Sequence, residues 1–235
     1  MLLLNVYEAV FLERKNRFVG EWLLQWQKVL FHIWDTGRLK ELLFEWNRIL
    51  IQKLEYWKRK YNWRLVWVKW LLWNFILINS LLHSALVREY LSNRKVKFIP
   101  EVKVWDSKID FLINNEIYVE VKGCSLIENI NWKWVWMFPD APTARGLKHL
   151  RELISLIKNW IQAEIWFLLT NDVNYFSPNF KTHNEFAKLF YEFLKLWWKV
   201  RFLAVRLDFH KNIKQANISL LDKKVDILKI DKNYN

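Results

Sequence analysis

The residues of this sequence best suited to catalysis lie in two adjacent segments, KIDFLI (108–113) and YVEVKG (118–123). Apolar and charged residues alternate in both segments, which predicts two β-strands. If the three residues between them, Asn114-Asn115-Glu116, form a loop, Asp110 lies directly opposite Glu120. Opposed residues of an antiparallel pair project from the same face, and Lys122, two residues further along its strand, shares that face. The sequence therefore predicts two carboxylates and an ammonium group close together.

This arrangement of charges is typical of a metal-dependent phosphodiesterase. Two neighbouring carboxylates repel each other unless a cation lies between them, so Asp110 and Glu120 are the expected ligands of Mg²⁺ or Mn²⁺. Lys122 can orient or activate water, or offset charge that develops on a phosphate. Asp110, Glu120 and Lys122 are thus the expected catalytic residues. Two alternatives stay open: a two-residue loop would place Asp110 opposite Val119 and on the other face, and a surface hairpin can carry an ordinary cross-strand ion pair.

Two further acidic residues can extend the metal site. Glu89 follows Leu82 by seven residues, on the same stripe of a predicted helix, and Glu101 begins the strand that leads into the hairpin. Each is either an auxiliary metal ligand or an ordinary solvated side chain, and the sequence leaves both interpretations open.

Downstream of the hairpin, the segment FPDAPTARGLKHLREL (138–153) places three basic residues at or near the start of a predicted helix. Backbone amides at a helix N-terminus attract phosphate, and Arg145 and Lys148 would strengthen that attraction. His149 can act as a base or a phosphate ligand, or it can be a buried, hydrogen-bonded histidine. Nearer the N-terminus, TGRLKELL (36–43) and KRKY (58–61) add basic residues next to expected loops.

The net charge favours a polyanionic partner. The chain of 235 residues has 37 Lys plus Arg against 24 Asp plus Glu, a formal charge of +13. Both parts of the chain are basic, with 13 basic against 7 acidic residues up to Ser80 and 24 against 17 after it. Because neutralising phosphates releases condensed counterions, nucleic acid is the expected partner. The alternative is that the charge serves solubility alone.

The location inferred from the sequence is the cytoplasm. Cys124 is the only cysteine, so no internal disulfide is expected, and the apolar start Met1–Leu4 is too short for a signal peptide. The apolar run from Leu65 to Leu82 is interrupted by polar residues, which argues against a membrane-spanning helix. No membrane association is expected, and the sequence leaves the oligomeric state open.

The pattern along the chain predicts a β-barrel followed by an α/β domain. Five short strands, interrupted by one helical turn near 39–44, are typical of a small barrel of the oligonucleotide-binding type. They are expected at 6–11, 18–24, 28–33, 48–52 and 64–68. A helix at 80–91, a strand at 100–104 and the catalytic hairpin follow. Helices at 143–158 and 184–196 then alternate with a strand at 163–169 and a last strand at 200–205. The expected fold class is α+β or α/β, with the barrel in residues 1–79 and the α/β domain in residues 80–235.

Glycine and tryptophan have unusual counts in this chain, 4 and 17. Average usage would give about sixteen glycines. Several tryptophans stand where turn chemistry favours a residue free to take positive φ, among them Trp26, Trp46, Trp105 and Trp160. One hypothesis is that many of them are glycine in the native protein, encoded by UGA codons that the source reads as glycine. The alternative is an aromatic-rich surface that stacks on nucleobases.

Several segments resemble the sugar fermentation stimulation protein A family, in family order across nearly the whole chain. They are NRF (16–18), TGRLKELL, KRKY, EVK (101–103), KIDFLI with YVEVKG, FPDAPTARG with KHLREL, and SPN (177–179). The resemblance implies an oligonucleotide-binding-like barrel and a domain of the restriction-endonuclease type, with Asp110, Glu120 and Lys122 as its motif residues. It also implies DNA as the partner. The residues expected to bind nucleic acid are Arg17, Arg38, Lys40, Arg59, Lys60, Arg145, Lys148 and His149.

The chain departs from the family mainly at turns. Trp46, Trp73, Trp105, Trp160 and Trp198 stand where the family would have glycine, whereas Trp63 lies in a family-like stretch and is expected to be genuine. The function expected from the sequence is a DNA-binding protein with a Mg²⁺-dependent nuclease site. The alternative is a non-catalytic DNA-binding regulator on a relict nuclease scaffold.

Overall fold

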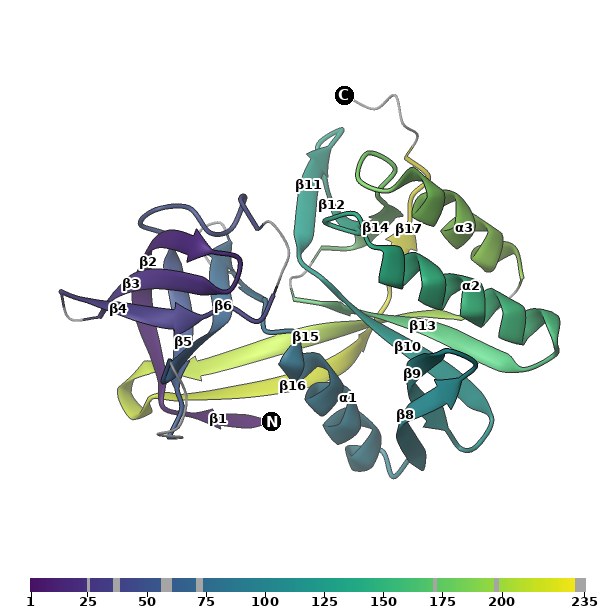
Figure 1. Ribbon diagram of the computed structural model, residues 1–235, viewed down its shortest axis with the longest axis horizontal. Helices are drawn as coiled ribbons and strands as arrows, with labels where there is room; N and C mark the ends of the chain where they lie inside the picture. The colour runs from purple at the N-terminus through teal and green to yellow at the C-terminus, as the bar shows by residue number, and fades with distance from the viewer. Residues whose placement is uncertain are drawn as a thin grey trace. The chain divides into compact units, whose positions relative to one another are not determined.

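The computed structural model describes residues 1–24, 26–35, 39–55, 61–70, 74–170, 173–196 and 199–230. These residues form two compact units, drawn in Figure 1. The first consists of Met1–Leu86 together with Val205–Leu220, and the second of Val87–Ala204 together with the described residues from Leu221 onward. The predicted domain boundary after residue 79 remains a prediction.

The first unit contains the predicted barrel. Its strands follow the neighbour order β4-β3-β2-β5-β6, and β4 closes the barrel by pairing with β6 through His32 and Arg64. The five barrel strands are β2 (Val6–Asn16), β3 (Val19–Leu24), β4 (Gln27–His32), β5 (Arg48–Lys53) and β6 (Trp63–Trp70). A further strand, β7 (Asn74–Leu77), pairs with β6. All five predicted barrel strands are confirmed.

The predicted helical turn at 39–44 is a single hydrogen-bonded turn. The amides of Leu42 and Leu43 both donate to the carbonyl oxygen of Leu39, at 3.1 and 2.7 Å. Leu39 and Leu42 are buried, so the turn contributes to the barrel's core.

The second unit is built on a mixed sheet with the neighbour order β15-β13-β10-β9-β8. Strand β13 runs parallel to β10 and to β15, while β9 is antiparallel to β10 and β8. These strands are β8 (Phe98–Val104), β9 (Ser107–Ile113), β10 (Ile117–Cys124), β13 (Gln162–Leu169) and β15 (Val200–His210). The predicted α/β core is therefore confirmed.

Three α-helices occur in the part of the chain that the structure describes, each at a predicted position: α1 (Leu81–Asn93), α2 (Ala144–Lys158) and α3 (Asn184–Lys195). Helix α2 packs on β13 and lies beside α3 (Figure 1). It begins where predicted because the Thr143 side chain accepts a hydrogen bond from the Gly146 amide, an N-cap that satisfies one free donor of the first turn. None of the described helices is long and apolar enough to cross a membrane.

Several strands were not predicted. They are β1 (Leu2–Leu4), β11 (Leu126–Ile130), β12 (Lys133–Phe138), β14 (Tyr175–Pro178), β16 (Gln215–Lys223) and β17 (Asp226–Ile227). The predicted strand at 200–205 is confirmed as the first part of β15, which continues to His210. It is not the last strand, because β16 and β17 follow it. Strands β11 and β12 form a hairpin in a second sheet with β14 and β17. Most of these strands pair with partners far away in sequence, and local alternation carries little information about such pairings.

Candidate metal-binding site

The hairpin that carries the candidate catalytic residues has the predicted three-residue loop. Strands β9 and β10 pair Ile113 with Ile117 and Phe111 with Val119. Asn114 and Asn115 in the loop have φ values of 50° and 60°, a conformation that asparagine adopts more readily than most residues. This register confirms the predicted loop and excludes the two-residue alternative. Asp110 and Glu120 are the next residues of the two strands beyond the last paired position.

The two carboxylates and the lysine meet as the sequence predicts. The Oδ2 atom of Asp110 accepts a hydrogen bond from the Val121 amide at 2.7 Å, which fixes its side chain against β10. Glu120 is only 2% exposed, and its Oε1 atom lies 2.5 Å from Nζ of Lys122. Three charged groups thus share one largely buried space, where electrostatic interactions are stronger than at the surface.

His149 joins this cluster from helix α2. It is only 4% exposed, and its Nδ1 atom contacts the Oε1 atom of Glu120. The sequence left His149 open as a base, a phosphate ligand or a buried, hydrogen-bonded histidine, and the structure shows the last of these. A signal was available: His149 lies between Leu147 and Leu150, on the apolar stripe that α2 buries.

The electrostatics differ between the two carboxylates. Burial, followed by repulsion from Glu120, raises the pKa of Asp110 from 3.8 to about 6. Burial alone would also raise the pKa of Glu120, but Lys122 and His149 outweigh that effect and lower it below its ordinary value. An added cation would therefore stabilise the charged form of Asp110 more than that of Glu120, because burial and repulsion disfavour the charge on Asp110.

One buried oxygen of the cluster has no hydrogen-bond partner in the described part of the protein. The Oε2 atom of Glu120 is buried and unpartnered, whereas its Oε1 atom is shared by Lys122 and His149. A buried carboxylate oxygen without a partner is costly. A cation between Asp110 and Glu120 would satisfy this oxygen and relieve the repulsion between the two carboxylates.

The two additional acids do not complete a larger metal cluster among the described residues. Glu101 is exposed, and its carboxylate pairs with Nζ of Lys108 at 3.3 Å. Glu89 is half-buried on α1 and engaged in an interaction there. Within the described ranges, no group of three or more His, Cys, Asp or Glu side chains is arranged to hold a metal ion. A cation bound by Asp110 and Glu120 would take its other ligands from water, backbone or substrate, as Mg²⁺ commonly does.

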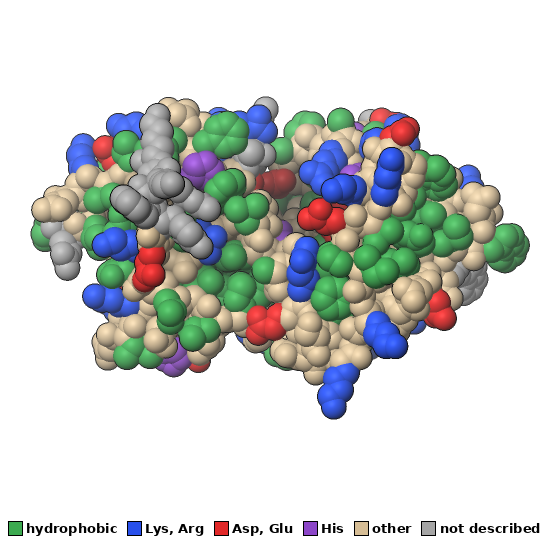
Figure 2. All heavy atoms as spheres, turned by 60° about the horizontal axis from the view of Figure 1, so that its bottom comes forward, with side chains coloured by type: hydrophobic (Ala, Val, Ile, Leu, Met, Phe, Trp, Pro, Cys, Tyr) green, Lys and Arg blue, Asp and Glu red, His purple; other side chains and the backbone are tan. Residues whose placement is uncertain are grey.

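The basic residues predicted to hold nucleic acid lie at the surface where the structure describes them. Arg145 and Lys148 are exposed on the first turns of α2, and Lys148 Nζ lies 3.4 Å from the carbonyl oxygen of Asp106. Arg17 and Lys40 are exposed in the first unit. The remaining predicted residues, Arg38, Arg59 and Lys60, lie outside the described residues. On the face shown in Figure 2, Lys and Arg side chains are spread out among hydrophobic ones rather than gathered in one patch.

Comparison with known proteins gives a consistent match over both units. Residues 76–212 match the family model described as the sugar fermentation stimulation protein RE domain, and residues 12–72 match the SfsA N-terminal OB domain. A sugar fermentation stimulation protein homolog of Thermosipho melanesiensis is 35% identical over 217 residues, which cover 92% of this chain and 95% of the relative. A homolog of Saccharolobus solfataricus is 36% identical over 217 residues, covering 92% and 86%.

A solved structure shares the fold. It is that of Pyrococcus furiosus SfsA in complex with Ca²⁺, and it matches this chain with a TM-score of 0.80 and 24% sequence identity. The match covers 97% of this chain and 98% of the other.

Proposed function

The chain belongs to the sugar fermentation stimulation protein family, and from that premise we propose that it binds nucleic acid and cleaves it at a divalent metal site on Asp110 and Glu120. The observation that carries this proposal is the convergence of the two carboxylates with Lys122 around a buried, unpartnered carboxylate oxygen. This cluster holds a carboxylate with a raised pKa and an oxygen without a donor, as an active site does.

The donor set fits a hard divalent cation. Both candidate ligands are carboxylates, which suit Mg²⁺, Mn²⁺ and Ca²⁺ rather than softer metals. The related P. furiosus protein was crystallised with Ca²⁺. For this chain we propose Mg²⁺ or Mn²⁺ as the metal that supports cleavage. Such a cation would supply electrophilic stabilisation of a phosphate and make a water molecule more acidic.

The protein's own side chains have separable roles in this proposal. Asp110 and Glu120 hold the cation, and the hydrogen bond from the Val121 amide fixes the direction of the Asp110 carboxylate. Lys122, whose ammonium group already lies beside Glu120, orients water or offsets charge on the phosphate. Arg145 and Lys148 hold the nucleic-acid strand at the start of α2.

A cleavage assay tests the proposal directly. The protein would be incubated with labelled single- and double-stranded DNA and RNA in the presence of Mg²⁺, Mn²⁺, Ca²⁺ or a chelator. We expect cleavage with Mg²⁺ or Mn²⁺ and none with chelator. Asp110→Asn and Glu120→Gln should each abolish cleavage while binding stays intact or improves slightly, because each removes a metal ligand and some repulsion of phosphate.

The matched control is Glu101→Gln, since Glu101 is a solvent-exposed acid close to the hairpin and paired with Lys108. It should cleave like the unchanged protein. If Asp110→Asn or Glu120→Gln cleaves at the unchanged rate, the site assignment is wrong. Binding without cleavage under every metal condition would instead favour the non-catalytic alternative.

A further inference from the structure

Five tryptophans adopt a backbone conformation that favours glycine. Their φ values lie between 47° and 68°: Trp26 (68°), Trp46 (67°), Trp105 (47°), Trp132 (64°) and Trp160 (63°). No glycine among the described residues has a positive φ. This reverses the usual distribution, because the Cβ atom of an L-residue clashes with the backbone in this region, whereas glycine has no Cβ.

The turn that contains Trp132 has the geometry of an Asn-Gly turn. Ile130 pairs with Lys133 across the β11–β12 hairpin, so Asn131 and Trp132 form a two-residue connection. Both have positive φ, 48° and 64°, which is the pattern of a type I′ turn. Asparagine followed by glycine is the preferred sequence of that turn, and the first of the two is present.

Trp160 lies at the end of helix α2, where helices most often place glycine. The Trp160 amide donates to the Ile157 carbonyl at 2.9 Å, and the Ile161 amide donates to the Leu156 carbonyl at 3.0 Å. With Asn159 as the C-cap, these two bonds form a Schellman motif. The residue after the C-cap in this motif takes positive φ and is usually glycine. Trp160 holds that position.

Trp105 belongs to a third turn of this kind. Val104 pairs with Ser107, so Trp105 and Asp106 connect β8 to β9. Only the first of these two residues has positive φ, the pattern of a type II′ turn, whose first central position is typical for glycine.

The indoles at these five positions contribute little to packing. Their exposed fractions run from 52% to 96%, and several exceed 90%. An aromatic surface for stacking nucleobases would explain exposure, but stacking places no demand on φ. The coincidence of high exposure, positive φ and glycine-type turns favours the hypothesis that these residues are glycine in the native protein.

Other tryptophans provide a contrast, because their side chains make specific contacts and their φ is not positive. Trp166 donates from Nε1 to Glu164 Oε2 at 2.7 Å, and the Arg201 guanidinium lies 4.9 Å from its ring centre. Trp63 packs edge-on against Tyr7, with ring centres 5.3 Å apart. The hydrogen bond of Trp166 needs an indole N–H, and the contact of Trp63 needs an aromatic ring.

We propose that residues 26, 46, 105, 132 and 160 are glycine in the protein that the source makes, encoded by UGA codons read as glycine. Trp26, Trp46, Trp105 and Trp160 were suspected from sequence, and Trp73 and Trp198 lie outside the described residues. Conformation supports these four positions and adds Trp132. Trp63 and Trp166 are tryptophan in the native chain.

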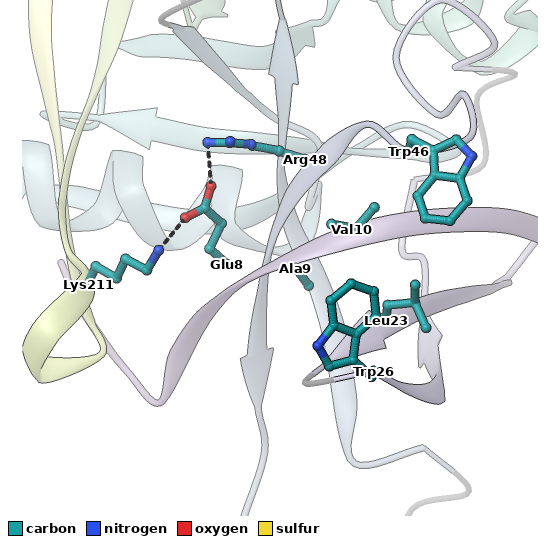
Figure 3. A pocket seen from close by; sticks show the side chains of 8 residues that line it. All are labelled: Glu8, Ala9, Val10, Leu23, Trp26, Trp46, Arg48 and Lys211. Atoms are coloured by element: carbon teal, nitrogen blue, oxygen red, sulfur yellow. Dashed lines mark hydrogen bonds and ion pairs between the residues drawn. The ribbon is translucent and has the colours of Figure 1, made fainter.

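The proposal changes the interpretation of a pocket of about 470 Å³ on the barrel. Trp26 and Trp46 contribute indoles to its lining, and Glu8 lies at its other end, paired with Arg48 at 3.2 Å and Lys211 at 3.1 Å (Figure 3). With both indoles present, the pocket resembles an aromatic cleft for a nucleobase. With glycine at 26 and 46, both indoles disappear, and the lining keeps the apolar side chains of Ala9, Val10 and Leu23 and the ion pairs of Glu8.

The direct test combines the gene's codons with peptide mass spectrometry of the protein isolated from its source. We expect UGA codons and glycine-containing peptides at the five positions, and UGG codons with tryptophan-containing peptides at 63 and 166. UGG codons at the five positions, or peptides with tryptophan there, would overturn the proposal.

A second test measures the conformational argument alone. Replacing any one of the five tryptophans by glycine should leave the urea midpoint of unfolding unchanged or raise it. The variants are Trp26→Gly and Trp46→Gly in the first unit, and Trp105→Gly, Trp132→Gly and Trp160→Gly in the second. The matched controls are Trp63→Gly in the first unit and Trp166→Gly in the second, and both should lower the midpoint clearly. A clear loss of stability at the five positions, equal to that of the controls, would contradict the conformational argument.

Discussion

Replacing Asp110 by asparagine should stabilise the metal-free protein. The Asp110 carboxylate is largely buried beside Glu120, and its pKa is raised from 3.8 to about 6. Asparagine has nearly the same shape, and its Oδ1 atom can still accept the hydrogen bond from the Val121 amide. The substitution therefore removes one buried negative charge and leaves the local geometry intact.

The size and pH range of the effect follow from the raised pKa. Between pH 3.8 and about 6 the folded state holds a proton on Asp110 that the unfolded chain has lost, so stability falls as the pH rises through this range. The full loss corresponds to about 3 kcal/mol, and because Asp110 is not completely buried we expect Asp110→Asn to be more stable by about 1–3 kcal/mol above pH 6. Below pH 3.8 the advantage should vanish, because the carboxyl group is then neutral in both states.

The assay is urea unfolding with chelator present, at a pH well above 6 and again near pH 3.8. Adding Ca²⁺ or Mg²⁺ at the higher pH should stabilise the unchanged protein and leave Asp110→Asn unaffected, because a ligand that binds only the folded state shifts its stability. Asp106→Asn, an exposed aspartate before β9, is the control and should show neither effect. If Asp110→Asn is less stable than the unchanged protein above pH 6 without metal, the electrostatic account of this site is wrong.

Three other predictions follow from the charge, the cluster and the barrel core. If the proposed nucleic-acid binding rests on phosphate contacts, as the charge of +13 predicts, affinity for unrelated DNA duplexes should be similar. It should fall by roughly tenfold or more between low and moderate salt. Salt-independent binding in a filter or anisotropy assay would refute this. His149→Ala should weaken Mn²⁺ binding by about 10–100-fold in calorimetry, because His149 holds Glu120, and His149→Asn should restore part of it. Equal Mn²⁺ affinity in the unchanged protein and both variants would show that His149 has no role in metal binding. Gly20→Ala should cost about 1–3 kcal/mol in urea unfolding, because the added Cβ would lie 2.3 Å from Cζ of the buried Phe31; an unchanged midpoint would show that the ring can move aside.

The hairpin of the candidate site could be predicted from sequence because its determinants are local. The strands alternate with period two, the loop is three residues long, and Asn114 and Asn115 can take positive φ. These features fix the register, and the register alone decides that Asp110 and Glu120 share a face. The barrel strands and the three helices were predictable for the same reason, since each carries its own periodicity.

Other parts of the molecule depend on pairings that no local pattern reveals. Strands β14 and β17 complete a sheet with β11 and β12, and Val205–Leu220 joins a unit that otherwise ends at Leu86. The residues involved have ordinary local composition, and their positions are decided by partners far along the chain. For Glu101 the sequence left two interpretations open, and the structure shows an exposed side chain paired with Lys108.

The sequence by itself determined which residues are candidates for catalysis, the two-part fold and the hypothesis about the tryptophans, because residue type, periodicity and composition are properties of the chain. Tertiary structure decided that His149 contacts Glu120 across 29 positions of sequence, since only the packing of α2 on the sheet brings them together. It also decided which tryptophans occupy glycine conformations, because φ is set by the turn that the flanking strands and helices close.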